Sequence, residues 1–452
     1  MNTKIFDISR AWKFLGFLTV LYFVGDLLRK VFGISSIVYI ISDLLLICFY
    51  VLSFLQYLHY GSQKNDFKIK WPVRKNFLLG LAIFCILLAA IISTLNAGLN
   101  SLFLSGLGLR TYLIALPMML IGYSNSKFLR NPNFAAKLDK FLTPILIFVV
   151  SISLLQSVGG FIGLDILPSL EHSYHSFYSH HISLVSSVFV SSKKFARFLL
   201  FLFIIIWMAR NVQGRKMAFL SMLSLYSIYV SGSREAFFLM LIFLLVDILF
   251  FSKSYKKLNI SQGVWRLIIT VSVSGMFVSL LVFIQRIQFM FATDNPFSFI
   301  QRGLQLFPLF WFDWSNSSLL FGNGPGSYGQ EKKLVAEVDQ SINQLDGYVS
   351  STAGIGDTVL HFLDSGLTRI IMELGLLGLI GYSFFLFYLF WMVRRDLFNN
   401  QCSVRFACAW IIVFYTIFFL KAHQFLSDTF MSIILFSVIG IFLKFRYLDT
   451  NT

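Results

Sequence analysis

Hydrophobic residues occur in long stretches, and short polar clusters separate one stretch from the next. A helix needs about 20 apolar residues to cross the hydrocarbon core of a bilayer, and many of these stretches approach that length. The pattern therefore predicts an all-α polytopic membrane protein with about twelve transmembrane helices. We expect them near residues 12–28, 34–58, 77–99, 103–122, 141–163, 195–210, 216–231, 234–252, 264–288, 366–393, 405–421 and 425–443.

Composition agrees with lipid as the main solvent. Hydrophobic residues make up 57% of the chain and charged residues only 13%, which leaves too little polar surface for a soluble protein of 452 residues. The net charge of +16 could suggest a nucleic-acid partner. However, the basic residues lie in short clusters between apolar stretches, which is typical of membrane orientation signals. We therefore expect no nucleic acid to bind.

The distribution of lysine and arginine predicts the orientation. If the N-terminus is cytoplasmic, about two thirds of the 37 basic residues fall on the cytoplasmic side, and so does the C-terminus. One segment, 175–192, is partly apolar but short, and Lys193, Lys194 and Arg197 follow it directly. A full crossing there would worsen the charge bias, so we interpret this segment as re-entrant or as a broken helix.

Three regions follow from this topology. Residues 1–288 contain the first nine transmembrane helices and the re-entrant segment, and residues 366–452 contain the last three. Between them, residues 289–365 form a large loop on the outer side. The loop contains aromatic residues suited to the membrane interface, so we expect a folded lid over the outer mouth.

Four arginines on the outer side are candidate ligand-binding residues, because membrane orientation does not require positive charge there. These are Arg110, Arg234, Arg302 and Arg369. Each alone could be an interfacial anchor or half of an ion pair. Four at one face favour an anionic ligand, and the planar guanidinium matches a phosphate or pyrophosphate.

A glycine-rich string, GNGPGSYG, contains Gly322, Gly324 and Gly326. It lacks the Lys-Ser/Thr ending of a nucleotide-binding loop, so we interpret it as a tight turn that lets the backbone approach a headgroup or a sugar.

Histidines and carboxylates suggest two further possibilities. The histidines between residues 172 and 181 fit no standard zinc spacing, so we expect no metal site and interpret them as a polar rim. His361 and Asp364 end the outer loop, and either could accept a proton from a sugar hydroxyl. The alternative is a helix-capping cluster with Asp364 at the N-cap.

These residues lie in motifs that resemble the O-antigen polymerase and ligase superfamily of membrane glycosyltransferases. SGSREAFF resembles the family's Ser-Arg-Gly-Ala element, with Glu235 where glycine is common. LFGNGPGSYG resembles the glycine element of the large outer loop, and HFLDSGLTRIIMELGLLGLIGY resembles the closing motif, with Phe362 where ligases usually have asparagine. GLGLRTYL and SSVFVSSKKFARFL add weaker similarity.

The resemblance implies a GT-C-like membrane fold in the bacterial inner membrane, with the active site facing the periplasm. It implies an inverting, metal-independent transfer without a cofactor, in which the growing glycan on undecaprenyl pyrophosphate is the donor and a lipid-linked repeat unit is the acceptor. A chain-length regulator is a possible partner. His361 and Asp364 would be catalytic, the four arginines would bind pyrophosphate, and Gly322, Gly324 and Gly326 would shape the loop.

Two other functions remain open. An O-antigen ligase would move the glycan to lipid A core, and a transporter would move the lipid-linked unit without chemistry. Transporters often contain internal repeats, whereas this chain has no repeat and has one large late loop, which suits an enzyme better.

Overall fold

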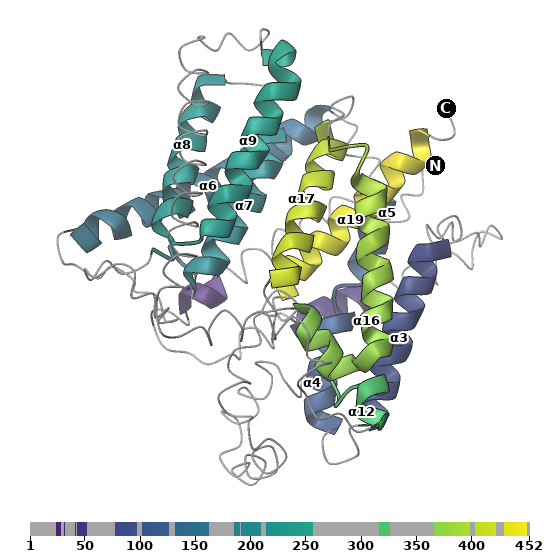
Figure 1. Cartoon of the computed structure of the whole chain (residues 1–452). Helices are drawn as coiled ribbons and strands as arrows, with labels where there is room; N and C mark the ends of the chain where they lie inside the picture. Colours follow the sequence, from purple (N-terminus) through teal and green to yellow (C-terminus); the bar gives the residue numbers. More distant parts are fainter. Residues whose placement is uncertain are drawn as a thin grey trace, which may run out of the picture. The chain divides into compact units, whose positions relative to one another are not determined.

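The structure is a computed structural model that describes residues 24–28, 31, 41, 43–51, 77–96, 102–125, 132–161, 185–189, 191–208, 214–255, 316–325, 366–397, 403–421 and 429–449. Within these ranges the chain is mostly helical and contains no strand (Figure 1). It divides into two compact units. Unit 1 comprises Met1–Leu46, Asn125–Ile287 and Arg395–Ile411, and unit 2 comprises Ile47–Ser124, Gln288–Arg394 and Ile412–Thr452.

Three helical stretches in the described residues are long and apolar enough to cross a membrane. They are Phe77–Asn96, Leu142–Gly159 and Gly366–Val393. Four shorter apolar stretches accompany them: Gly108–Tyr123, Phe219–Val230, Arg405–Phe419 and Met431–Lys444. An all-α membrane protein is therefore supported, whereas the total of about twelve helices stays a prediction. The expected helix at 264–288 and the loop 289–365, apart from residues 316–325, lie outside the described residues.

Unit 1 contains α6 (Pro132–Phe161), α7 (Ser192–Met208), α8 (Gly214–Val230) and α9 (Arg234–Tyr255). Helix α6 begins well before the expected residue 141, because Pro132 suits a first helical position and the polar run after it continues the helix. Pro144 lies inside α6. Helix α17 (Ser403–Lys421) contributes residues to both units.

The turn between α8 and α9 follows directly from its sequence, Ser231-Gly232-Ser233. Gly232 has a φ of 72°, a left-handed conformation that glycine adopts without a steric penalty and that commonly ends helices. The carbonyl of Ser233 accepts a hydrogen bond from the Phe237 amide at 3.1 Å, so Ser233 occupies the N-cap of α9. The motif SGSREAFF is thus a compact helix–turn–helix connection.

Unit 2 contains α3 (Phe77–Asn96), α4 (Leu102–Leu113), α5 (Pro117–Asn125), α12 (Asn316–Phe321), α16 (Gly366–Val393) and α19 (Thr429–Asp449). The helix expected at 103–122 is two helices, because Pro117 has no amide hydrogen and its ring conflicts with the carbonyl one turn earlier. Tight turns replace the continuous helix, such as the Leu116 amide donating to the Leu113 carbonyl at 3.1 Å.

Helices α3 and α16 lie side by side, and the short α12 contacts both at one end (Figure 1). Glycines permit close approach elsewhere in the unit. A Cβ on Gly440 of α19 would overlap the Met119 carbonyl of α5, and a Cβ on Gly122 of α5 would overlap the Ser437 carbonyl of α19. Small residues at such crossings are typical of helix packing in membranes.

Candidate functional site

Helix α16 contains a sharp kink that divides it into residues 366–374 and residues 376–393. Gly375, between them, has φ 67° and ψ −165°, which is not helical. The last four carbonyls of a helix have no amide partner within that helix. The break therefore leaves the carbonyls at the end of residues 366–374 in need of other donors.

The glycine turn after α12 supplies these donors. The amide of Asn323 donates to the Met372 carbonyl at 3.0 Å, and the amide of Gly324 donates to the Glu373 carbonyl at 3.2 Å. The Asn323 side chain adds a second contact to the Met372 carbonyl at 3.3 Å. The turn that follows α12 therefore caps the first half of α16.

This contact requires glycine on both sides. Gly322 and Gly375 both have positive φ, at 75° and 67°. A Cβ on Gly322 would overlap backbone atoms of Glu373 and Leu374, and a Cβ on Gly375 would overlap backbone atoms of Leu320 and Gly322. The glycines thus permit a close backbone contact between two motifs that lie about fifty residues apart in the sequence.

The end of α3 completes the contact. The hydroxyl of Ser93 donates to the Glu373 carbonyl and lies 3.1 Å from the Gly324 amide nitrogen. The side-chain amide of Asn96 donates to the Gly322 carbonyl at 2.8 Å. Three segments from different parts of unit 2 therefore converge at the kink of α16.

A charged cluster lies inside this junction. Arg369 Nε donates to Glu373 Oε1 at 2.9 Å, and the side chains of both residues are completely buried. The hydroxyl of Tyr112, on α4, donates to Glu373 Oε2 at 2.6 Å and is also buried. The carboxylate thus receives hydrogen bonds from its own helix and from a neighbouring helix.

Aromatic rings lie beside the cluster. The ring of Tyr112 meets the ring of Tyr382 edge to face at a centroid distance of 6.1 Å. Tyr382 in turn stacks on Phe419 of α17 at 5.7 Å. Apolar surroundings make a buried charge costly, so the ion pair and its hydrogen bonds are needed to retain it.

Unit 1 contains the other pair of motifs, and they lie against one another. Residues 185–189 are not helical, and the Val185 amide donates to the Val230 carbonyl, at the end of α8, at 3.4 Å. Arg197, in α7, lies with a guanidinium nitrogen 4.0 Å from Glu235 Oε2, in α9. The segments SSVFVSSKKFARFL and SGSREAFF are therefore neighbours.

The irregular backbone of residues 185–189 is buried and is held by Gln156 of α6. The Gln156 side chain accepts from the amides of Ser186 and Ser187, at 3.2 and 2.7 Å, and donates to the Ser187 carbonyl at 2.9 Å. Irregular backbone at membrane depth is tolerated where protein satisfies it in this way. Whether residues 175–192 re-enter the membrane stays a prediction, since most of them lie outside the described residues.

The expected site residues fall into three groups. Arg369, Gly322 and Gly324 meet at the junction in unit 2, and Arg110 is half-buried on α4, two residues before Tyr112. Arg234 begins α9 in unit 1, and its side chain is not among those described. His361, Asp364, Arg302, Gly326 and the histidines of residues 172–181 lie outside the described residues.

Sequence reasoning missed Glu373, Tyr112 and Ser93. Glu373 had a detectable signal, because it lies four residues after Arg369 in an otherwise apolar run, the spacing of an ion pair on one helix face. The ion pair offered as the alternative explanation for an isolated arginine is therefore present at Arg369. Tyr112 and Ser93 had no such signal, because their contacts join distant helices.

Comparisons of the chain with protein-family models, with curated proteins and with solved structures find no match.

Proposed function

We propose that this protein is an O-antigen-type polysaccharide polymerase that joins undecaprenyl-pyrophosphate-linked repeat units. One observation carries the proposal. The glycine element and the closing motif, which both belong to the family resemblance, pack together around a buried arginine, Arg369. A charged group enclosed among membrane helices is costly to keep and is a functional candidate by default.

The proposed chemistry is an inverting glycosyl transfer. An acceptor hydroxyl oxygen attacks the anomeric carbon of the donor sugar, and the bond from that carbon to the pyrophosphate oxygen breaks. Undecaprenyl pyrophosphate leaves with the bonding electron pair, and His361 or Asp364 accepts the hydroxyl proton. Pyrophosphate is a good leaving group, so the protein needs mainly to stabilise its charge and to orient the acceptor. Arginine side chains provide that stabilisation without a metal.

The proposed location is the bacterial inner membrane, with the active site at the periplasmic face in a GT-C-like arrangement. Support comes from the charge bias of the sequence. Labelling of Gln340→Cys in intact cells tests the orientation. We expect a membrane-impermeant thiol reagent to label this position in cells whose outer membrane alone is permeable. Labelling only after the inner membrane is opened would reverse the orientation.

The activity test is incubation of the purified protein in lipid nanodiscs with a synthetic lipid-linked repeat unit. A polymerase gives a ladder of products. Transfer of glycan only to a lipid A core acceptor would identify a ligase instead, and movement of the unit across vesicles without any covalent product would identify a transporter.

The same assay tests the pyrophosphate role of the arginines. We expect Arg369→Lys and Arg234→Lys to lose about 30- to 1000-fold in rate, because a lysine lacks the guanidinium fork, equivalent to about 2–4 kcal/mol of transition-state stabilisation. Arg395→Lys is the matched control, because Arg395 is exposed beyond the end of α16. Normal ladders from both site variants would contradict the role.

A further inference from the structure

Glu373 belongs to the charged cluster and also contacts the glycine turn. Its carboxylate accepts hydrogen bonds from Arg369 at 2.9 Å and from Tyr112 at 2.6 Å. Its backbone carbonyl accepts from the Gly324 amide at 3.2 Å and from the Ser93 hydroxyl. Glu373 therefore connects the charged cluster, through its side chain, to the glycine turn, through its backbone.

We propose that Glu373 is a positioning residue that links Arg369 to the glycine turn, and that its carboxylate occupies Arg369 until an anionic pyrophosphate group displaces it. This inference rests on the proposed function, which assigns pyrophosphate to Arg369. It adds that the Glu373 carboxylate competes with pyrophosphate for Arg369, and that ligand binding changes the contact between Glu373 and the glycine turn.

The competition follows from charge. The pair of Arg369 and Glu373 is completely buried, so water screens the attraction between the two charges only weakly. A pyrophosphate carries more negative charge than one carboxylate and fits the guanidinium fork, so it can replace the carboxylate. Tyr112, on a different helix from Arg369, continues to donate to Glu373 while the exchange takes place.

The link to the turn follows from the kink. Residues 366–374 end at Gly375, and the amides of the turn hold that end at the carbonyls of Met372 and Glu373. Movement of the Glu373 side chain away from Arg369 shifts the end of this short helix. The contact with Gly324 weakens, and the turn is released as the ligand binds.

The test measures binding of inorganic pyrophosphate to the purified full-length protein in nanodiscs by isothermal titration calorimetry. Glu373→Gln keeps the size and one acceptor oxygen of the side chain but removes the competing charge. We expect it to bind pyrophosphate about tenfold more tightly than the wild type and to turn over more slowly, because the turn is no longer coupled to the ligand. A purely structural residue would not tighten ligand binding when it is replaced.

Two variants extend the test. Ser93→Ala keeps all charges but removes a hydroxyl that holds both the Glu373 carbonyl and the turn. We expect about threefold tighter pyrophosphate binding, because displacement of Glu373 then breaks fewer contacts. Asp396→Asn is the control, because Asp396 is also a buried carboxylate paired with an arginine, Arg405, but in unit 1. Its affinity for pyrophosphate should equal that of the wild type.

The outcomes separate the two proposals. If the wild type binds pyrophosphate and a folded Glu373→Gln or Ser93→Ala variant binds it equally or more weakly, the link through Glu373 is wrong and the proposed function is unaffected. If Glu373→Gln does not fold, Ser93→Ala alone decides the matter. If the wild type does not bind pyrophosphate at all, the assignment of pyrophosphate to Arg369 is wrong and this inference falls with it.

Discussion

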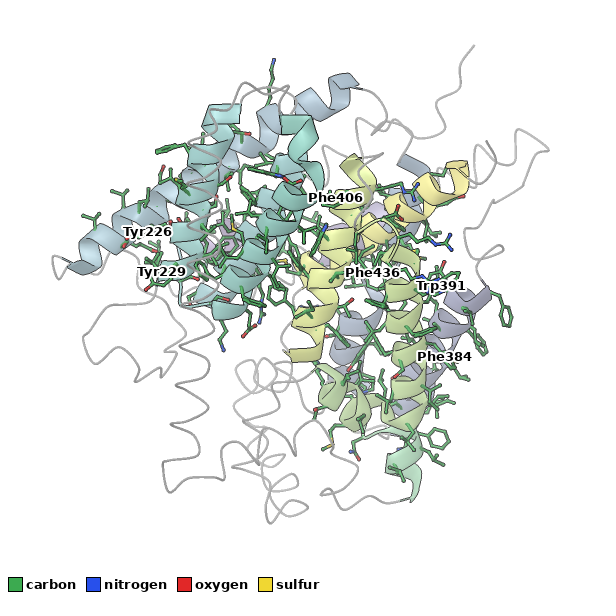
Figure 2. The ribbon with its side chains drawn as sticks, turned by 45° about the horizontal axis from the view of Figure 1, so that its top comes forward. Tyr226, Tyr229, Phe384, Trp391, Phe406 and Phe436 are labelled. Carbon is green, nitrogen blue, oxygen red and sulfur yellow. The ribbon has the colours of Figure 1, made fainter. Side chains whose placement is uncertain are left out.

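The two parts of α16 on either side of Gly375 differ in their surroundings and in their charged residues. In residues 366–374 every side chain except that of Leu367 is buried, and the buried set includes Arg369 and Glu373. Residues 376–393 contain no charged residue and have one exposed face. That face consists of Ile380, Ser383, Phe384, Phe387, Phe390 and Trp391, of which Phe384 and Trp391 are labelled in Figure 2.

The difference shows that two parts of one helix can have different environments. The second half is arranged as a lipid-facing helix, with Phe385 packed inward against Phe436 at a centroid distance of 5.9 Å. The first half is buried except at Leu367 and holds a charge pair. Gly375 separates the two environments, because its left-handed backbone ends one helix and allows the next to take a different direction.

The largest loss in the free energy of unfolding is expected when the buried pair of Arg369 and Glu373 is broken. Glu373→Leu leaves the Arg369 guanidinium buried without its carboxylate, and we expect a loss of about 3–5 kcal/mol in the free energy of unfolding. The double variant Arg369→Met with Glu373→Leu removes both charges and should recover most of that loss. Equilibrium unfolding in micelles measures both. Equal losses in the single and double variants would show that the two charges do not stabilise each other.

The sequence predicted the outer limits of α16 and most of the other described helices to within a few residues. Length and hydrophobicity set these limits, and both can be read locally. The kink was not predicted, because Gly375 is one of four glycines in α16 and only its contact with the glycine turn distinguishes it. The break between α4 and α5 was missed for a different reason: Pro117 lies inside an apolar stretch, and membrane helices often tolerate proline.

A smaller effect is expected when the kink itself is altered. Gly375→Ala places a Cβ in the left-handed region and against the backbone of Leu320 and Gly322. We expect a loss of about 2–3 kcal/mol, from the conformational penalty and the steric overlap together. Gly106→Ala is the matched control, since no atom of the described residues lies within 4 Å of the Cβ it would add in α4. The same unfolding assay applies, and a loss no larger than that of the control would mean that the kink is not fixed by this contact.

Only those parts of the candidate site that depend on one residue and its local sequence could be predicted. Arg369 was recognised because an arginine at the predicted outer end of an apolar stretch is unusual, and Gly322 and Gly324 because glycine strings mark turns. The contact between the glycine turn and the end of residues 366–374 could not be predicted. It depends on Ser93 and Asn96 at the end of α3 and on amides of the turn itself. Backbone partners and distant polar side chains leave no local pattern in the sequence.

The smallest effect is expected on the exposed face of the second half. Phe384→Leu should change the free energy of unfolding by about 0.5 kcal/mol or less, because Phe384 is 42% exposed and the replacement is also apolar. Phe385→Leu, one residue away, should cost about 1 kcal/mol, because Phe385 is 3% exposed and loses ring contacts with Tyr382 and Phe436. Neither variant touches Arg369 or the glycine turn, so both should retain the pyrophosphate affinity of the wild type. A Phe384→Leu variant that unfolds more easily than Phe385→Leu would show that this face of the helix packs against protein, and the contrast between an enclosed half and a lipid-facing half would then be wrong.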